Sequence, residues 1–194
     1  LFPGQGSQTI GMGADLFARH PDFVRTASED LGWDLAEVCL QDPRGELTQT
    51  QFTQPALYVV GALAWLRAVE TGHRLPRFLV GHSLGEYTAL FAADAFSFRD
   101  GLALVKERGA AMAEARGGAM AAVLGLPPEK VAEVIAEHAL TGVWLANRNA
   151  PGQAVISGEP AAVKDCHQAF LDAGAKRVVP LNVSGAFHSP LMAP

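Results

Sequence analysis

Hydrophobic residues recur every three or four positions through most of the first 117 residues, a spacing typical of amphipathic helices. The pattern predicts helices at four places: 13–25, 33–39, 55–71 and 100–115. We expect His20-Pro21 to break the first helix, Asp34 to cap the second and Pro55 to lie in the first turn of the third. The apolar run 77–80 instead predicts a short buried strand, which a further helical pattern follows almost at once.

From residue 118 onwards, short runs of small and β-branched residues alternate with helical stretches. The predicted strands are 119–126, 142–146, 153–157 and 176–183, and the predicted helices are 127–138 and 160–173. This β-α-β-β-α-β order is typical of a ferredoxin-like domain. We therefore expect a larger part over 1–117, a ferredoxin-like small subdomain over 118–183 inserted into it, and a return to the larger part over 184–194.

The segment 78–90 carries the clearest chemical signal. Its pentapeptide GHSLG at 81–85 matches G-x-S-x-G between a predicted strand and a predicted helix, which is the context of a nucleophile elbow. Glycines at both ends let the chain turn sharply and hold Ser83 at the tip of the turn. The backbone N–H of Leu84 would then point towards negative charge that develops beside Ser83. The alternative is a chance match in an ordinary turn, which the flanking elements make the weaker interpretation.

Two further segments hold candidate polar groups. The N-terminal loop is rich in glycine, but it lacks G-x-x-x-x-G-K-[ST], and Thr9 interrupts G-x-G-x-x-G, so it does not match a phosphate-binding loop. Glycines on both sides of Gln5 let its backbone N–H approach a ligand closely, and a tight turn is the plainer alternative. His188 follows the last predicted strand. A single histidine is more often structural, but a candidate nucleophile elsewhere in the chain needs a base.

Composition narrows the class of protein. The net charge is −5 and the pI is about 5.6, so no basic footprint indicates nucleic-acid binding. Cys39 and Cys166 lack the spacing of a disulfide framework or a zinc site. No apolar run reaches the roughly 20 residues of a membrane helix, and no signal peptide opens the chain, so we expect a cytoplasmic protein. We also expect both ends of the sequence to continue into a longer protein.

The motifs occur in one order along nearly the whole chain: LFPGQGSQ at 1–8, TQPA at 53–56, GHSLGE at 81–86, Arg108, NAPGQ at 149–153, ISG at 156–158 and AFHS at 186–189. In this order they resemble the malonyl-CoA:acyl carrier protein transacylases, whose fold also serves as the acyltransferase domain of fatty acid and polyketide synthases. The resemblance implies an α/β-hydrolase-like large subdomain with an inserted ferredoxin-like small subdomain. It also implies further large-subdomain segments after Pro194, since family members are longer.

The resemblance implies a ping-pong acyl transfer. Ser83 would attack the thioester of malonyl-CoA while His188 accepts its proton and returns it to the departing thiol. The backbone N–H groups of Gln5 and Leu84 would form the oxyanion hole. Arg108 would bind the free malonyl carboxylate through two parallel hydrogen bonds, which lysine cannot match. The phosphopantetheine thiol of acyl carrier protein would then take the malonyl group from Ser83.

The same resemblance implies the substrates and the remaining site residues. CoA is a substrate and 4′-phosphopantetheine is carried by the partner, so no metal or prosthetic group is expected. Phe187 would fill the space of an α-methyl group and favour malonyl over methylmalonyl, a preference of roughly 1–3 kcal/mol. Gln54, Asn147 and Asn149 could line the acyl pocket, and turn or capping roles are equally open.

The carrier protein is expected to be acidic, like this chain, so its docking would need a local basic patch. Arg148, Lys176 and Arg177 are the candidates for such a patch. His82 and Glu86 belong to the motif, but the sequence assigns them no role beyond support of the elbow. We expect a monomer that binds neither nucleic acid nor membranes.

Two other functions use the same elbow. A hydrolase for neutral acyl thioesters or esters would have no use for Arg108, and an acyltransferase-like domain without activity would not need Ser83, His188 and Arg108 together. A ferredoxin-like binding module alone would leave residues 1–117 unexplained. The sequence does not separate a fatty acid enzyme from a polyketide enzyme, and it does not identify the carrier protein.

Overall fold

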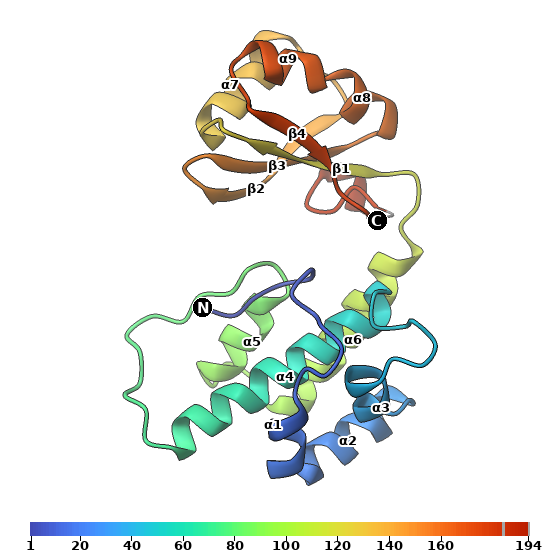
Figure 1. Ribbon diagram of the computed structural model, residues 1–194, viewed down its shortest axis with the longest axis vertical. Helices are drawn as coiled ribbons and strands as arrows, with labels where there is room; N and C mark the ends of the chain where they lie inside the picture. The colour runs from blue at the N-terminus through green and yellow to red at the C-terminus, as the bar shows by residue number, and fades with distance from the viewer. Residues whose placement is uncertain (184, 194) are drawn as a thin grey trace. The chain divides into compact units, whose positions relative to one another are not determined.

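The computed structural model describes residues 1–183 and 185–193 of the chain (Figure 1). The chain folds into two compact units, Leu1–Ala113 and Glu114–Pro194. The predicted boundary at 117 and the predicted return of 184–194 to the first part stay predictions, and Ser184 and Pro194 lie outside the described residues. Within those described residues, no helix combines the length and apolar character needed to cross a membrane.

The first unit is built from helices packed around a long central one. Its helices are α1 (Ala14–Arg19), α2 (Pro21–Leu31), α3 (Leu35–Leu40), α4 (Thr50–Glu70), α5 (Gly85–Ala92) and α6 (Phe98–Glu114). α4 supplies much of the core, and its Tyr58 is fully buried. The Tyr58 ring stacks on Phe98 with 5.8 Å between ring centroids, and its hydroxyl donates to the Phe98 carbonyl at 3.1 Å. The core therefore joins α4 to the start of α6.

Two predicted helix boundaries are confirmed. The first predicted helix is broken at His20-Pro21, because α1 ends at Arg19 and α2 begins at Pro21. Proline suits this position because the N–H that it lacks has no intrahelical partner in a first turn. Asp34 caps α3, since its carboxylate accepts a hydrogen bond from the backbone N–H of Glu37 at 2.9 Å.

The prediction that Pro55 lies in the first turn of the long helix is wrong. α4 begins at Thr50, and Pro55 lies inside the helix. Thr53 anchors this early part, because its side chain is buried and its hydroxyl donates to the carbonyl of Leu47 at 2.6 Å. Tertiary packing thus outweighs the loss of the one hydrogen bond that proline removes from the helix.

The strand predicted over 77–80 is not formed. Among the described residues, its end is joined to other backbone only by an isolated parallel bridge between Phe2 and Gly81. At that bridge the N–H of Phe2 donates to the carbonyl of Val80 at 2.8 Å. Phe78 and Val80 are 75% and 55% exposed. An apolar run becomes a strand only where neighbouring strands complete its hydrogen bonds, and the pattern along the chain does not supply those neighbours.

The second unit contains a four-stranded antiparallel sheet with its α-helices on one side (Figure 1). Its elements are β1 (Ala119–Leu124), α7 (Pro128–Glu137), β2 (Val143–Ala150), β3 (Gln153–Gly158), α8 (Pro160–Asp165), α9 (His167–Asp172), β4 (Arg177–Pro180) and the 3-10 helix η1 (Pro190–Met192). The strand order is β2-β3-β1-β4, and every neighbouring pair is antiparallel. The predicted β-α-β-β-α-β order is confirmed.

The core of the second unit lies between the sheet and these helices, where Val131, Ile156 and Phe170 are fully buried. The helix predicted over 160–173 is divided into α8 and α9 at Cys166, whose ψ of −8° departs from the helical value. β2 extends further than predicted, to Ala150. Asn147 and Asn149 fall between the predicted strands 142–146 and 153–157, but they lie in β2, where its register with β3 is irregular.

Candidate active site

The G-x-S-x-G turn has the backbone geometry of a nucleophile elbow. Ser83, at its tip, has a φ of +53°, in the left-handed region that residues with a side chain rarely adopt. A Cβ on Gly81 would stand 2.1 Å from the backbone nitrogen of Glu86, and one on Gly85 would stand 2.2 Å from the carbonyl oxygen of Phe2. Only glycine fits at either end, so the turn closes and α5 packs against the N-terminal segment.

The helix α5 starts directly from this turn. The backbone N–H of Glu86 donates to the carbonyl of Ser83 at 3.1 Å, and that of Tyr87 donates to the carbonyl of Leu84 at 3.0 Å. The side chain of Leu84 is buried in the core of the unit and anchors the turn. The N–H of Leu84 lies at the N-terminal end of α5, where unpaired N–H groups attract negative charge.

The N-terminal glycine-rich loop lies against the same turn. A Cβ on Gly4 would stand 2.5 Å from the carbonyl oxygen of His82, so a larger residue could not bring the loop this close. Gln5 follows and is exposed, and its side-chain amide donates to the hydroxyl of Thr50 at 3.2 Å. Among the described residues, no backbone carbonyl accepts a hydrogen bond from the N–H of Gln5 or of Leu84. An oxyanion hole requires N–H groups of this kind.

Arg108 brings a positive charge to Ser83. From α6, its Nη2 donates to the Oγ of Ser83 at 3.1 Å. Its Nη1 donates to the Oε1 of Gln54 on α4 at 2.5 Å. Its guanidinium carbon lies 5.8 Å from the ring centroid of Tyr87 on α5, within the range of a cation–π contact. Side chains from α4 and α5 thus hold the guanidinium of α6 beside the candidate nucleophile.

Among the described residues, Arg108 forms no ion pair, although the charge of Glu86 acts on it from a greater distance. Whereas Arg44 and Arg99 form ion pairs, no carboxylate oxygen lies within 4.0 Å of Arg108 in the described part of the chain. Burial lowers the pKa of Arg108, because desolvation disfavours a charged group. A guanidinium nevertheless stays protonated in proteins. A half-buried cation with neutral hydrogen-bond partners is a natural site for an anionic ligand.

Gln54 is fully buried, and both ends of its amide are engaged. Its Oε1 accepts from Arg108, and its Nε2 donates to the sulfur of Met112 at 3.0 Å.

The sequence did not single out Met112 or Tyr87. Each follows a predicted site residue by four positions, Tyr87 after Ser83 and Met112 after Arg108. Arg108 and Met112 therefore share one face of α6, a signal that could have found Met112, whereas Ser83 precedes α5 and gives no such signal for Tyr87.

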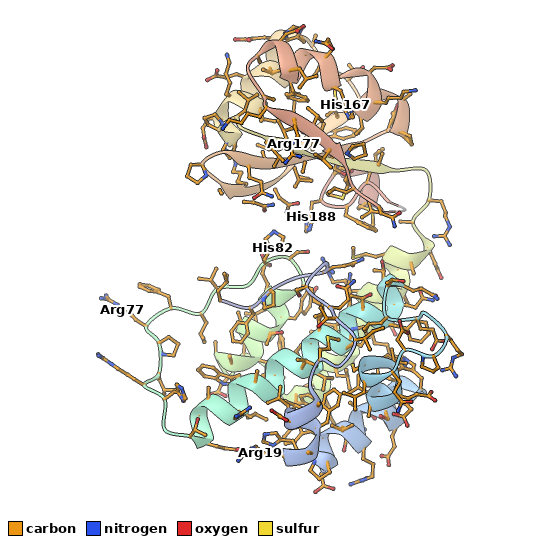
Figure 2. The ribbon with its side chains drawn as sticks, in the orientation of Figure 1. Arg19, Arg77, His82, His167, Arg177 and His188 are labelled. Carbon is orange, nitrogen blue, oxygen red and sulfur yellow. The ribbon has the colours of Figure 1, made fainter. Side chains whose placement is uncertain are left out.

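In the second unit, His188 lies in the loop between β4 and η1 and is exposed (Figure 2). Its φ is +60°, also in the left-handed region. The hydroxyl of Ser189 donates to the carbonyl of Ala186 at 2.6 Å and so constrains this loop.

Phe187 is buried, and its ring lies 2.7 Å from the place that a Cβ on Gly185 would occupy. Phe187 therefore packs inside its own unit, and its predicted role in substrate choice stays a prediction.

The residues predicted to form a basic patch do not form a single cluster. Arg148 pairs with Glu129 at 2.7 Å and lies on β2, at one edge of the sheet. Arg177 begins β4, at the opposite edge (Figure 2), and Lys176 precedes it. Lys176 and Arg177 are both exposed. Only these last two remain neighbours that could meet an acidic partner together.

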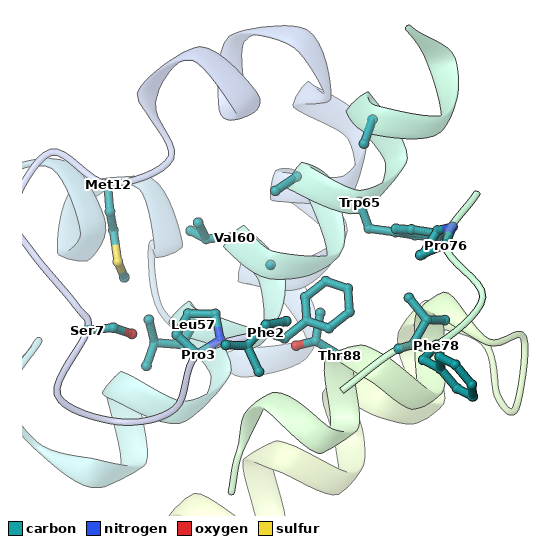
Figure 3. Close-up of a pocket in the computed structure, with 15 residues that line it drawn as sticks. Phe2, Pro3, Ser7, Met12, Leu57, Val60, Trp65, Pro76, Phe78 and Thr88 are labelled. Carbon is teal, nitrogen blue, oxygen red and sulfur yellow. The ribbon is translucent and has the colours of Figure 1, made fainter. Parts of the chain in front are cut away.

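An apolar pocket of 460 Å³ lies elsewhere in the first unit (Figure 3). It opens between α4 and the segments 1–3 and 76–79, and its lining includes Phe2, Val60, Trp65 and Phe78. None of the candidate site residues lines it, so it is not the pocket predicted for the acyl group.

A protein-family model described as an acyl transferase domain matches residues 1–194. The chain belongs to this family. Polyketide biosynthesis protein ThaF of Burkholderia thailandensis is 57% identical to this acyl transferase domain over 192 residues, which make up 99% of this chain and 17% of ThaF. The polyketide biosynthesis malonyl CoA-acyl carrier protein transacylase PksC of Bacillus subtilis is 49% identical over 193 residues, which are 99% of this chain and 67% of PksC.

Solved structures share the mixed α/β fold of this acyl transferase domain. The crystal structure of a malonyl CoA-acyl carrier protein transacylase from Burkholderia pseudomallei aligns with a TM-score of 0.92 at 47% identity, over 100% of this chain and 66% of that one. The solved structure of a type II PKS acyl-carrier protein in complex with its malonyl-transacylase contains a chain that aligns with a TM-score of 0.90 at 42% identity. The alignment covers 98% of this chain and 64% of the chain in that complex. The chain thus spans about two thirds of the length of these solved relatives.

Proposed function

We propose that this acyl transferase domain moves a malonyl group from malonyl-CoA to the phosphopantetheine thiol of an acyl carrier protein. The observation that carries the proposal is the 3.1 Å hydrogen bond from Arg108 to Ser83. It joins a serine at the tip of an elbow to a cation that, in the described residues, has no carboxylate partner. Such a cation suits an acyl group that carries its own carboxylate. The names of the relatives PksC and the Burkholderia pseudomallei transacylase support the same acyl donor.

The first half-reaction loads the enzyme. The Oγ of Ser83 attacks the thioester carbonyl, and His188 accepts the hydroxyl proton. Negative charge develops on the carbonyl oxygen, and the N–H groups of Gln5 and Leu84 stabilise it. The carbon–sulfur bond then breaks, and His188 returns the proton to the sulfur of CoA. The product is a malonyl ester on Ser83.

The second half-reaction reverses these steps with a different thiol. The phosphopantetheine thiol of the carrier protein gives its proton to His188 and attacks the malonyl ester. The carbon–oxygen bond breaks, and Ser83 regains its proton from His188. The two thiols, Ser83 and His188 account for every proton transfer, so we expect no metal or prosthetic group on this chain, and the phosphopantetheine belongs to the carrier protein.

Arg108 supplies the selectivity for the malonyl group. Its guanidinium binds the free carboxylate through paired hydrogen bonds, in place of its present contact with Ser83. Because Gln54 and Tyr87 already hold it, little side-chain freedom remains to be lost on binding. Phe187 adds a smaller preference for malonyl over methylmalonyl.

We also propose how the two parts of the chain are organised. Residues 1–117, together with 184–194, form part of an α/β-hydrolase-like subdomain, and residues 118–183 form a ferredoxin-like subdomain. The parallel bridge between Phe2 and Gly81 and the strand order β2-β3-β1-β4 support this description. The solved complex of a relative with an acyl carrier protein supports the choice of partner. We expect a cytoplasmic monomer.

The test is the intact mass of the protein after brief exposure to malonyl-CoA, beside acetyl-CoA and a Ser83→Ala control. We expect a malonyl adduct that is absent from Ser83→Ala, forms much more slowly in His188→Ala and is discharged by holo-acyl carrier protein. Discharge to water at the same rate with and without the carrier would identify a hydrolase instead. A folded protein that never forms the adduct would identify a domain without transacylase activity.

A further inference from the structure

We propose that Gln54 is a positioning residue that makes Arg108 selective for an anionic acyl group, because it binds the guanidinium through a neutral oxygen. This inference rests on the proposed function, since it assigns Gln54 a role in malonyl transfer. Gln54 acts through Arg108 and does not touch the substrate, because none of its side chain is exposed. The sequence alone left Gln54 as one of several residues that could line the acyl pocket.

The position of Arg108 depends on this one buried side chain. The Oε1 of Gln54 accepts from Nη1 at 2.5 Å, while the other arm of the guanidinium donates to Ser83. A charge-assisted hydrogen bond of this kind fixes both the place and the plane of the guanidinium. Without it, Arg108 would keep the Tyr87 contact but lose the partner that aims its second arm at the nucleophile.

A second contact orients the amide of Gln54. If the amide were turned over, its NH₂ would face the N–H groups of Arg108, and two donors would meet. The sulfur of Met112 prevents this, because it accepts from Nε2 at 3.0 Å and has no hydrogen to donate. Arg108 and Met112 lie one turn apart on α6, so a single helix face binds both ends of one amide.

The close approach of α4 and α6 makes this arrangement possible. A Cβ on Gly109, the residue after Arg108, would stand 3.2 Å from the Cα of Gln51 and 3.3 Å from the carbonyl oxygen of Thr50. Glycine at this position lets α6 lie directly against the first turn of α4. The side chains of Arg108 and Gln54 can then meet inside the unit.

The neutrality of Gln54 is the feature that decides selectivity. A glutamate has almost the same shape and would accept the same hydrogen bond, but its carboxylate would neutralise Arg108 from behind. The malonyl carboxylate would then meet an ion pair in place of a cation, and like charges would lie close together. Glutamine holds the guanidinium equally firmly and leaves its charge for the substrate.

The test compares Gln54→Glu with Gln51→Glu, which adds the same charge to an exposed position on the same helix. Initial rates of acyl-Ser83 formation are measured by intact mass with malonyl-CoA and with acetyl-CoA. For Gln54→Glu we expect the malonyl rate to fall about 100-fold and the acetyl rate to change less than about threefold. For Gln51→Glu we expect both rates to stay within about twofold of the unsubstituted protein.

Equal losses with both donors, or an unchanged malonyl rate, in a folded Gln54→Glu protein would overturn the inference. Failure of the unsubstituted protein to accept malonyl would instead overturn the proposed function. If Gln54→Glu does not fold, Met112→Leu tests the same idea, since it removes the sulfur and keeps the volume. There we expect a several-fold higher KM for malonyl-CoA at an unchanged KM for acetyl-CoA, and no difference between the donors would contradict the role of Gln54.

Discussion

At the scale of single residues, both candidate catalytic groups have an unusual backbone conformation. Ser83 and His188 have φ values of +53° and +60°. Such conformations cost free energy and persist only where the surrounding contacts impose them. At Ser83 the contacts are those of Gly81 and Gly85 with neighbouring backbone, and near His188 the Ser189 hydroxyl closes the loop. The side chains are thereby held in place before any substrate binds.

Arg108 gives the most direct prediction at this scale. In Arg108→Lys the charge remains, but one ammonium group cannot bond Gln54 and also bind a carboxylate through two parallel hydrogen bonds. We expect malonyl loading of Ser83 to fall by about 10- to 100-fold, while acetyl loading changes little. Initial rates of adduct formation with both donors measure this. Full malonyl activity in Arg108→Lys would show that a point charge suffices and that the guanidinium geometry is not used.

At the scale of elements, the elbow depends on two segments that are distant in sequence. The N-terminal segment and α5 meet where Gly85 faces the carbonyl oxygens of Phe2 and Pro3, at 2.2 Å and 2.8 Å from the place of a Cβ. The N–H of His82 also donates to the carbonyl of Phe2 at 3.0 Å. The backbone of the N-terminal segment therefore supports the turn that presents Ser83.

Gly85→Ala tests this packing. The new methyl group would overlap backbone atoms that cannot move aside as a side chain can, so we expect a loss of stability of about 2–3 kcal/mol and a displaced elbow. Gly152→Ala is the control, because its Cβ would meet nothing within 4 Å, and we expect a change within about 0.5 kcal/mol. Urea unfolding followed by circular dichroism measures both variants. Similar midpoints for the two would contradict the close contact between α5 and the N-terminal segment, as would normal Ser83 loading in Gly85→Ala.

At the scale of the whole molecule, each unit has its own core and one buried cysteine. Burial raises the pKa of the Cys39 thiol in the first unit to about 12 and that of Cys166 in the second unit to about 11, from an ordinary value of 9.0. Desolvation causes both shifts, because a thiolate is poorly stabilised in an apolar core. The folded state thus holds both thiols protonated at pH values where the unfolded chain would ionise them.

The sign of the resulting pH dependence follows from the raised pKa values. Stabilisation from each neutral thiol is complete below pH 9 and is lost as the pH rises through the folded pKa of about 11 to 12. At pH 10 we expect about 1 kcal/mol less stability per thiol than at pH 8. Urea unfolding at several pH values measures this, and the double variant Cys39→Ala/Cys166→Ala should lose that part of the slope. An identical slope in the double variant would exclude the thiols as its source.

Much of the candidate site could be predicted because its signals are local. The G-x-S-x-G turn is recognisable because glycine alone tolerates the close contacts at both ends of it. Arg108 was found by its place in a family motif. Tyr87 and Met112 were not, because their importance comes from contacts with Arg108 and Gln54, and the sequence marks neither residue as part of a site.

The sequence by itself determined the sharp turn at Ser83, the break at His20-Pro21 and the β-α-β-β-α-β order, because a period of 3.6 or 2 and the freedom of glycine act within a few neighbouring residues. The tertiary structure alone decided that α4 begins at Thr50, that 77–80 does not form a strand, and that Gln54 holds Arg108. These outcomes depend on contacts between segments far apart in the chain. Their free energies exceed local preferences, and no local pattern records them.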